Sequence, residues 1–478
     1  MVFMSCKKAV RSIWNLAQIC PIAHIADANL KWPHGTIQIN IIKMQADILH
    51  KYVKVPVGTD MMPIHNIDYE KIAEFADVIQ FNHYRDEGSL WEVLVWYDYI
   101  RTLKDRPFWN TETSTCWNGA HFIPNLIRKE GFCRALSWLP IAMGGEANLY
   151  WLWRQHRASH ELMHGAVLYA NGRPMHTFGE VQQLAAEYAR CADFINGTKV
   201  TADLAMMIDS DSYMMQACQP IYPDDGWLYY SRTRGLHTSL REYGVRPDLI
   251  APSHSFDGYK ILMTPFMPSL ERKGLYDRIE EWVKAGGTWV VGPITDIRNA
   301  VGGHYTKAAT GRLEEWTGAT LTDQVPDKDN HVTCNWKDGE PFSAYGMLQL
   351  FDDLPADCEV LASVTGGVYP SLSGKAVAFR KPFGKGQILV LGTTPNAAGL
   401  ARLLDVACQY TPVRRFTFEG NVTVVPRKGA AGEGLAVVEH RGEPASVTLD
   451  EPMTDLITGK RLEGKVELKP YDVLILKK

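Results

Sequence analysis

Residues 77–112 read DVIQFNHYRDEGSLWEVLVWYDYIRTLKDRPFWNTE, and they contain one complete strand–helix–strand unit. The runs DVIQFNHY (77–84) and RPFWNTE (106–112) are short and apolar, which is typical of buried parallel strands. The segment LWEVLVWYDYIRTL (90–103) between them has the apolar spacing of an amphipathic helix. This stretch therefore predicts a parallel sheet with helices packed against it.

The same alternation extends on both sides of this unit. Toward the N-terminus, IIKMQADILHKYV (41–53) and DYEKIAEFA (68–76) predict helices, and KVPVGTD (54–60) predicts a strand. Toward the C-terminus, IRKEGFCRALSWLPIAMG (127–144) predicts a helix and EANLYWLWR (146–154) predicts a fourth strand. A (β/α)8 barrel needs eight such units and about 250 residues, so four units predict a partial TIM barrel.

The pattern changes twice further along the chain. Apolar strands alternate with helices again after residue 200, which favours an open, flavodoxin-like α/β sheet, and the Gly-, Pro- and Asp-rich segment 300–383 is expected to be irregular and to cover one edge of it. After residue 413, short strands separated by turns predict a small antiparallel β domain. The predicted organisation is an irregular N-terminal segment (1–35), the C-terminal half of a barrel (36–198), an α/β domain (199–412) and a small β-sandwich (413–478).

Composition excludes several classes of protein. With 46% hydrophobic and 22% charged residues, the 478-residue chain is an ordinary folded protein, and a net charge of -4 without a basic block argues against nucleic-acid binding. The nine cysteines form no CxxC pair, so we expect no metal and no cofactor. Dispersed cysteines indicate reduced thiols and a cytoplasmic location. The first 20 residues form a weak signal peptide and no transmembrane span, so no membrane partner is expected.

The predicted barrel strands all end in polar or aromatic residues, where the functional groups of parallel barrels collect. Glu112 ends the third strand, and a carboxylate is costly to bury there without a purpose or a partner. Retaining glycosidases use two carboxyl groups about 5–5.5 Å apart, one as nucleophile and one as acid/base. Glu112 is the candidate nucleophile, although position alone explains it equally well as the partner of a barrel arginine.

Three stretches carry a resemblance to a known family. PFWNTETSTCWNG (107–119), GGEANLYWLWRQ (144–155) and HELMHGAVL (160–168) resemble the nucleophile strand, the last barrel strand and the loop that follows it in glycoside hydrolase family 42, the β-galactosidases. The resemblance covers about residues 36–478. It implies a retaining hydrolase of terminal β-D-galactosides that assembles as a homotrimer through its middle, trimerisation domain.

The resemblance also implies roles for single residues. Glu112 takes the place of the nucleophile. The implied substrate-binding residues are Tyr84 beside the nucleophile, Trp117 and Trp151 along the pocket, and Glu161 and His164 on sugar hydroxyls.

Four further residues near these motifs have two explanations. Trp153 and Arg154 fill the family's WR pair, where they support the site from behind or act as core and ion-pair residues. Asn82 and His83 at their strand end suit the hydroxyls of a sugar, or they cap the following helix.

One part of the family pattern is missing. The family's acid/base Glu follows an Asn in an N-E-Y setting, which does not occur in this chain, and the earlier strand-end carboxylates Asp60, Asp86 and Glu87 are not in its register. We therefore expect a truncated or split reading frame, with the other barrel half supplied by a separate chain or lost. Loss of a general acid costs about 10²–10⁴-fold in rate, so the chain alone is expected to be weakly active or inactive.

Two other classes of function are compatible with parts of the sequence. A non-catalytic sugar-binding or oligomerisation protein would keep the aromatic pocket and the middle domain without turnover. An amidotransferase-like enzyme would need a cysteine nucleophile on a sharp strand–helix turn, and neither Cys218 nor Cys334 lies in such a turn.

Overall fold

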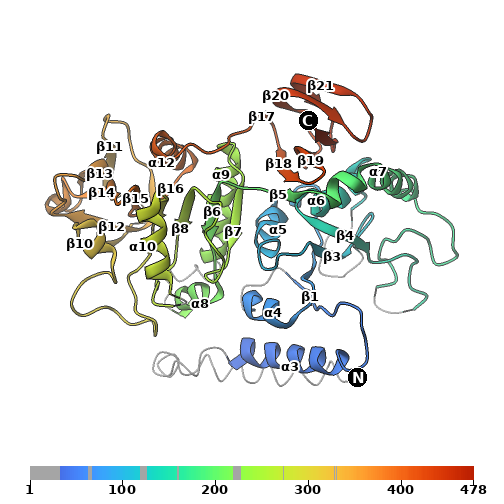
Figure 1. The fold of residues 1–478 in the computed structure, drawn as a ribbon, viewed down its shortest axis with the longest axis horizontal. Coiled ribbons are helices and arrows are strands. Elements are labelled where there is room, and N and C mark those ends of the chain that lie inside the picture. Colours follow the sequence, from blue (N-terminus) through green and yellow to red (C-terminus); the bar gives the residue numbers. More distant parts are fainter. Residues whose placement is uncertain are drawn as a thin grey trace.

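The structure is a computed structural model that describes residues 33–62, 67–118, 126–158, 161–218, 228–272, 274–327, 329 and 331–478. Three sheets follow one another along the chain, and the first and the third lie side by side (Figure 1). The expected segment 1–35 lies almost entirely outside the described residues. None of the helices in the described part is both long and apolar enough to cross a lipid bilayer.

The first sheet has four parallel strands in chain order, as the sequence predicts. They are β1 (Asp60–Met61), β2 (Gln80–Asn82), β3 (Phe108–Thr113) and β4 (Gly145–Tyr150). The helices around them are α3 (Pro33–Leu49), α4 (Tyr69–Phe75), η1 (Leu90–Val93), α5 (Leu94–Ile100), α6 (Phe132–Ala142) and α7 (Phe178–Asn196). Helix α3 begins eight residues before the expected position, at a proline, which the first turn of a helix accommodates well.

The two faces of this sheet differ in chemistry. Phe81 and Phe108 pack against α5, with ring centroids 5.9 Å from Trp96 and 5.3 Å from Tyr97 respectively. Side chains alternate along a strand, so Asn82, which follows Phe81, points to the opposite face. The buried aromatic face thus fixes the sheet against its helices and leaves polar side chains on the concave side.

The second sheet is built around five parallel strands in the order β7–β6–β8–β9–β15. Numbered along the chain, this order is 2-1-3-4-5, the flavodoxin-like arrangement that the sequence predicts. The strands are β6 (Leu204–Met207), β7 (Pro247–Ile250), β8 (Ile261–Thr264), β9 (Thr288–Val291) and β15 (Gly386–Leu391). Its helices are α8 (Ser210–Cys218), α9 (Leu228–Glu242), α10 (Leu275–Ala285), α11 (Leu313–Thr317) and α12 (Ala397–Tyr410).

The segment 300–383 is not irregular, which corrects the prediction. Antiparallel strands extend the sheet beyond β15, and the positive φ angles of Gly346 (89°) and Gly367 (138°) show that its glycines mark bends and strand ends. These added elements are β10 (Thr320–Asp327), β11 (Val332–Trp336), β12 (Ala344–Asp352), β13 (Glu359–Gly367), η3 (Pro370–Leu372), β14 (Ala376–Phe383) and β16 (Thr394–Pro395).

The third sheet is antiparallel and has the order β17–β20–β22–β19–β18–β5, with β21 paired to β20. Its strands are β17 (Thr417–Glu419), β18 (Val422–Gly429), β19 (Gly432–Glu439), β20 (Ala445–Asp455), β21 (Arg461–Leu468) and β22 (Val473–Lys477). The sixth member of the path, β5 (Lys199–Val200), comes from the segment that follows α7. This short strand links the C-terminal sheet directly to the end of the first unit.

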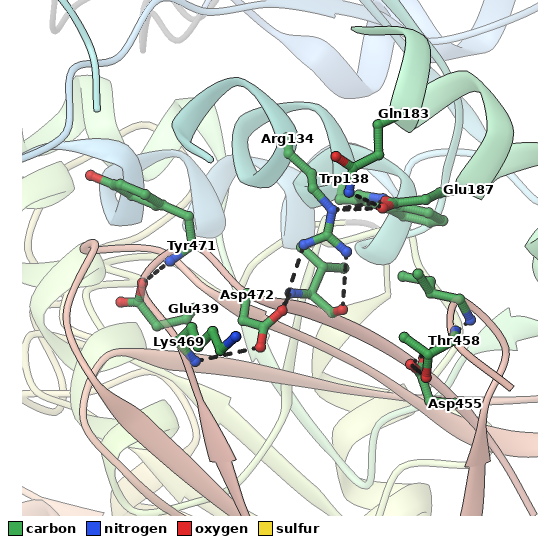
Figure 2. A network of polar contacts seen from close by, with 12 residues as sticks. Arg134, Trp138, Gln183, Glu187, Glu439, Asp455, Thr458, Lys469, Tyr471 and Asp472 are labelled. Carbon is green, nitrogen blue, oxygen red and sulfur yellow. Dashed lines mark hydrogen bonds and ion pairs between the residues drawn. The ribbon is translucent and has the colours of Figure 1, made fainter. Parts of the chain in front are cut away.

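A polar network joins helices α6 and α7 to the C-terminal sheet (Figure 2). Arg134 on α6 donates through Nε to Oε2 of Glu187 on α7 at 2.9 Å and through Nη2 to the carbonyl of Val473 at 3.3 Å. Trp138 donates to the same Glu187 carboxylate at 2.7 Å. One arginine therefore ties two barrel helices to strand β22.

A second arginine, Arg427 on β18, reaches into the same junction from the C-terminal sheet. Its guanidinium donates to the carbonyls of Ile141, Ala142, Ile195 and Thr198 at 2.9–3.2 Å. These carbonyls lie at the C-terminal ends of α6 and α7, where helix carbonyls have no partner within the helix. Arg427 thus caps both helices.

The junction between the first and second sheets is a buried charge cluster around Asp98 of α5. The Asp98 carboxylate accepts from Arg246, from Arg101 at 2.9 Å and from Nε2 of His237 at 2.8 Å. Arg101 also donates to Asp248 of β7 at 2.7 Å. Three basic groups around one fully buried carboxylate hold its pKa at about 2, below the ordinary value, even though burial alone would raise that pKa.

Candidate active site

Glu112 lies near the end of β3, in the central part of the four-stranded sheet. Its Oε1 accepts a hydrogen bond from the hydroxyl of Tyr84 at 2.5 Å, and its Oε2 accepts one from Nδ2 of Asn82 at 3.3 Å. Among the described residues, no lysine or arginine forms an ion pair with this carboxylate. The described structure therefore offers no arginine for the alternative explanation of Glu112 as an ion-pair residue.

Burial raises the pKa of Glu112, the hydrogen bond from Tyr84 lowers it, and the nearby charge of Asp60 raises it again, for a net increase. The pKa of Tyr84 is also raised, by burial and then by its contact with Glu112. Tyr84 consequently keeps its proton and donates, while Glu112 accepts. Such a carboxylate can act as a nucleophile once it is ionised.

His164 lies behind the Tyr84 ring. The two ring centroids are 5.8 Å apart with an interplanar angle of 75°. His164 is buried, and burial lowers the pKa of its imidazole, which favours the neutral form. Its Nδ1 lies 2.7 Å from the carbonyl of Gly165, which makes Nδ1 the donor and leaves Nε2 as the acceptor nitrogen.

The loop that contains His164 is fixed to the segment after β3. The amide of Gly165 donates to the carbonyl of Trp117 at 3.1 Å, and the Trp117 indole donates to the carbonyl of Met163 at 2.6 Å. A Cβ atom on Gly165 would lie only 2.3 Å from Sγ of Cys116, so glycine is the residue that allows this contact. Trp117 and His164, 47 positions apart in the sequence, are thereby brought together.

Trp151 and Glu161 form the next contact along this edge. The Trp151 indole donates to Oε2 of Glu161 at 3.2 Å, and the ring of His156 lies edge-on to Trp151 at 5.7 Å. About a third of the Trp151 side chain is exposed, so an apolar surface is available beside the Glu161 carboxylate. The Trp117 ring differs from the Trp151 ring in its partner, because it stacks on the ring of His176 with an interplanar angle of 4°.

The pair Trp153 and Arg154 lies outside this group. Trp153 is 63% exposed, so it is not a core residue. Arg154 donates through Nε and Nη2 to the carbonyl of Ala170 at 2.9 and 2.7 Å, which fixes the loop that follows the strand.

The interpretation of Asn82 and His83 as helix caps is wrong. Asn82 donates to the carboxylates of Asp60 and Glu112, and His83 is buried with its Nε2 in contact with the Tyr97 hydroxyl. The sequence places Asn82 and Asp60 at strand ends but does not predict that Asn82 donates to both Asp60 and Glu112. Their signal was their position, because Asn82 ends β2, the neighbour of β3, and Asp60 begins β1, the neighbour of β2.

No group of three or more His, Cys, Asp or Glu side chains in the described part of the chain is arranged to hold a metal ion. Cys334 lies inside the antiparallel strand β11, and burial raises the pKa of its thiol to about 12. Such a thiol is a poor nucleophile, which argues against Cys334 as the nucleophile of an amidotransferase.

Three family models match consecutive parts of the chain. They are described as "Beta-galactosidase" (residues 26–191), "Beta-galactosidase trimerisation domain" (202–413) and "Beta-galactosidase C-terminal domain" (421–478). The chain belongs to glycoside hydrolase family 42. Its family 42 domains occur in the order expected from the sequence.

Curated relatives of this chain include beta-galactosidase YesZ of Bacillus subtilis, 30% identical over 445 residues, and YesZ of Bacillus licheniformis, 28% identical over 443 residues. Each alignment covers 90% of this chain and 65% of the relative, so the chain spans slightly less than two thirds of their length.

Solved structures show the same fold. A catalytic mutant of Gan42B, a beta-galactosidase from G. stearothermophilus, matches with a TM-score of 0.85 and 21% identity, over 95% of this chain and 68% of that one. The beta-galactosidase from Bacillus circulans sp. alkalophilus matches with a TM-score of 0.84 and 22% identity, over 92% and 66% of the two chains.

Proposed function

We propose that this chain is the nucleophile-bearing part of a retaining β-galactosidase, with Glu112 as the nucleophile. The observation that supports it is the placement of the Glu112 carboxylate at a strand end, between two neutral donors and without a described cationic partner. Neutral donors hold the carboxylate in place and leave it free to attack an anomeric carbon. The family relationship adds support, since the named relatives are β-galactosidases.

In the proposed reaction, an oxygen of Glu112 attacks C1 of a terminal β-D-galactoside. A C1–O bond to Glu112 forms while the bond from C1 to the leaving oxygen breaks, and that oxygen departs with the electron pair and takes a proton from the acid/base group. Water then hydrolyses the galactosyl-enzyme. Trp151 provides an apolar surface for the sugar ring, and Glu161, His164, Tyr84 and Trp117 are the proposed substrate-binding residues.

We propose further that the acid/base carboxylate is carried by another polypeptide segment, which completes the barrel beside β1 and β4. Each of these strands has a neighbour on one side only among the described strands. Exposed apolar side chains lie on α3, which precedes β1 in the chain, and on β4. They are Ile37, Ile41, Met44 and Ile48 along one stripe of α3, and Leu149 on β4. Open strand edges with apolar surroundings are normally covered in a folded protein.

A covalent trap tests the role of Glu112 without needing the missing acid. In a 2-deoxy-2-fluoro-β-galactoside with a dinitrophenyl leaving group, the dinitrophenolate departs without being protonated. The nucleophile alone therefore decides whether label accumulates. We expect mass spectrometry to find the fluorogalactosyl group on the peptide that contains Glu112, and no label in the Glu112→Gln variant. Absence of label from the natural chain, or label elsewhere, would favour a non-catalytic sugar-binding or oligomerisation protein.

The partner is tested separately, by expressing the chain together with the reading frame upstream of it. A complex that hydrolyses lactose, while this chain alone does not, is the expected result. High lactose turnover by the chain alone would show that the acid is already present.

We propose a homotrimer assembled through the middle domain, because that domain matches a trimerisation model. Sedimentation should show a species of three times the mass of the chain, and a monomer would contradict the proposal. We also propose a cytoplasmic location, which is supported by the free thiols that the described part of the chain shows at Cys116, Cys133, Cys191, Cys334, Cys358 and Cys408.

A further inference from the structure

Asp60 links three strands of the first sheet on its concave side. It is the first residue of β1, its Oδ1 accepts a hydrogen bond from the hydroxyl of Thr111 on β3, and its Oδ2 accepts one from Nδ2 of Asn82 on β2. Both carboxylate oxygens are therefore used to hold one side chain of β2 and one of β3.

The amide of Asn82 serves two carboxylates at once. Its Nδ2 donates to Asp60 and, at 3.3 Å, to Oε2 of Glu112. Asn82 is only 6% exposed, and its Oδ1 is buried without a hydrogen-bond partner among the described residues. An unpartnered buried acceptor costs about 1–3 kcal/mol. If the Asn82 amide were reversed, its Oδ1 would face two carboxylates, which is less favourable than an unpartnered Oδ1. Asp60 and Glu112 together therefore fix the orientation of the Asn82 amide.

Two titratable groups act directly on the Glu112 carboxylate, Asp60 from β1 and Tyr84 from the segment after β2. Two more act on Tyr84: the His164 ring contacts the Tyr84 ring edge-on, and the charge of Glu161 raises the pKa of Tyr84. The neutral donors Tyr84 and Asn82 favour the ionised form of Glu112, whereas burial and Asp60 oppose it. Asp60 thus both repels the charge of Glu112 and holds one of its two donors in place.

We propose that Asp60 is a positioning residue for Glu112, and that it holds the Asn82 amide so that Nδ2 faces Oε2 of the nucleophile. The inference rests on the proposed function only in calling Glu112 a nucleophile. The contact itself predicts two separable effects: removing the charge of Asp60 makes Glu112 easier to ionise, and removing its acceptor oxygens frees Asn82 to turn away.

Two variants of Asp60 separate these effects. Asp60→Asn removes the charge but keeps an oxygen that accepts from Asn82. The acid limb of the labelling profile is the range in which the labelling rate falls with decreasing pH. We expect this limb to move to lower pH by about 0.5–2 pH units, because a nearby like charge has been removed. The plateau rate above the limb should be kept. Asp60→Ala removes both the charge and the acceptor oxygens. The acid limb should therefore also move to lower pH, and the plateau rate should fall about tenfold. Circular dichroism and thermal unfolding check that both variants fold.

The matched control is Glu146→Gln, another strand carboxylate of the same sheet, whose Oε1 accepts from the Trp109 indole at 2.7 Å. Glutamine keeps this acceptor, and we expect neither the limb nor the plateau to change. An unchanged acid limb in Asp60→Asn, or equal plateau rates in Asp60→Asn and Asp60→Ala, would overturn the positioning role.

A second readout keeps this inference distinct from the proposed function. Carbodiimide modifies protonated carboxyl groups, so its pH dependence at the Glu112 peptide, followed by mass spectrometry, reports the ionisation of Glu112 without any sugar. A lower midpoint in Asp60→Asn supports the coupling even if the fluorogalactoside leaves no label, in which case only the glycosidase proposal fails. Equal midpoints in the natural chain and Asp60→Asn overturn the coupling whatever the sugar does.

Discussion

The hydroxyl of Tyr84 and Oε1 of Glu112 are joined by a hydrogen bond of 2.5 Å, between a residue that follows β2 and a residue of β3. The tyrosine keeps its proton because burial and the neighbouring carboxylate both raise its pKa. The bond therefore has a fixed direction, from phenol to carboxylate, and it stabilises the ionised form of Glu112.

Replacing Tyr84 by Phe removes this donor and keeps the ring that packs on His164. A hydrogen bond to a charged group is worth about 1.5–3 kcal/mol, so we expect fluorogalactoside labelling to slow by about tenfold to a hundredfold. The pKa of Glu112 should rise, because the lost bond favoured its charged form, and the acid limb should move to higher pH. This direction is opposite to that expected for Asp60→Asn. A labelling profile equal to that of the natural chain would show that Tyr84 does not act on Glu112.

Replacing Gly165 by Ala tests the contact between the 161–165 loop and the segment after β3. The added Cβ would lie 2.3 Å from Sγ of Cys116 and 2.7 Å from the carbonyl of Trp117. We expect the loop to shift, the protein to lose about 1–3 kcal/mol of stability, and galactose to bind more weakly by calorimetry. The matched control is Gly179→Ala, within helix α7. There an added Cβ would have no atom within 4 Å, apart from its chain neighbours and the backbone of its own helix, so stability should be kept or slightly increased. Equal behaviour of the two variants would contradict the tight contact.

The cluster around Asp98 predicts a pH dependence of stability. Burial lowers the pKa of His237 to about 4, although its bond to Asp98 opposes that shift. Below about pH 6.5 the unfolded chain binds a proton at this histidine while the folded chain does not, so stability falls as the pH drops from 6.5 toward 4. Asp98, with a pKa near 2, adds its own loss only below about pH 4.

The variant His237→Gln keeps a side-chain donor for Asp98 and removes the titration. We expect the natural chain to lose on the order of 2 kcal/mol more than this variant between pH 7 and pH 4.5, measured by thermal unfolding. Parallel curves for the two proteins would show that His237 titrates normally in the folded state.

Arg427→Met tests the cap on helices α6 and α7. Its loss leaves helix-end carbonyls without their donor in a buried junction, which should cost about 2–4 kcal/mol in the free energy of unfolding. The neighbouring Lys428→Met serves as control, because Lys428 forms an exposed ion pair with Glu433 and should change stability by less than about 1 kcal/mol. Urea unfolding of both variants makes the comparison. Equal costs would contradict the cap.

The sequence determined much of the fold. Short apolar runs such as 77–84 and 106–112 can be buried on a sheet only as parallel strands with helices between them, and this periodic pattern located all four strands of the first sheet and the parallel strands of the second. The prediction that the segment 300–383 is irregular is wrong. Its glycines and prolines indicate turns, but they do not determine which strands pair across these turns. That pairing is long-range and is decided by packing.

The candidate site divides in the same way. Glu112, Tyr84, Glu161 and His164 stood out through local motifs, because a strand end or a glycine-flanked loop is visible in the sequence itself. The amide of Asn82 between the carboxylates of Asp60 and Glu112 was not visible, since these residues are 22 and 30 positions apart along the chain. Only the parallel register of β1, β2 and β3 places their side chains within hydrogen-bonding distance, and register depends on the whole sheet.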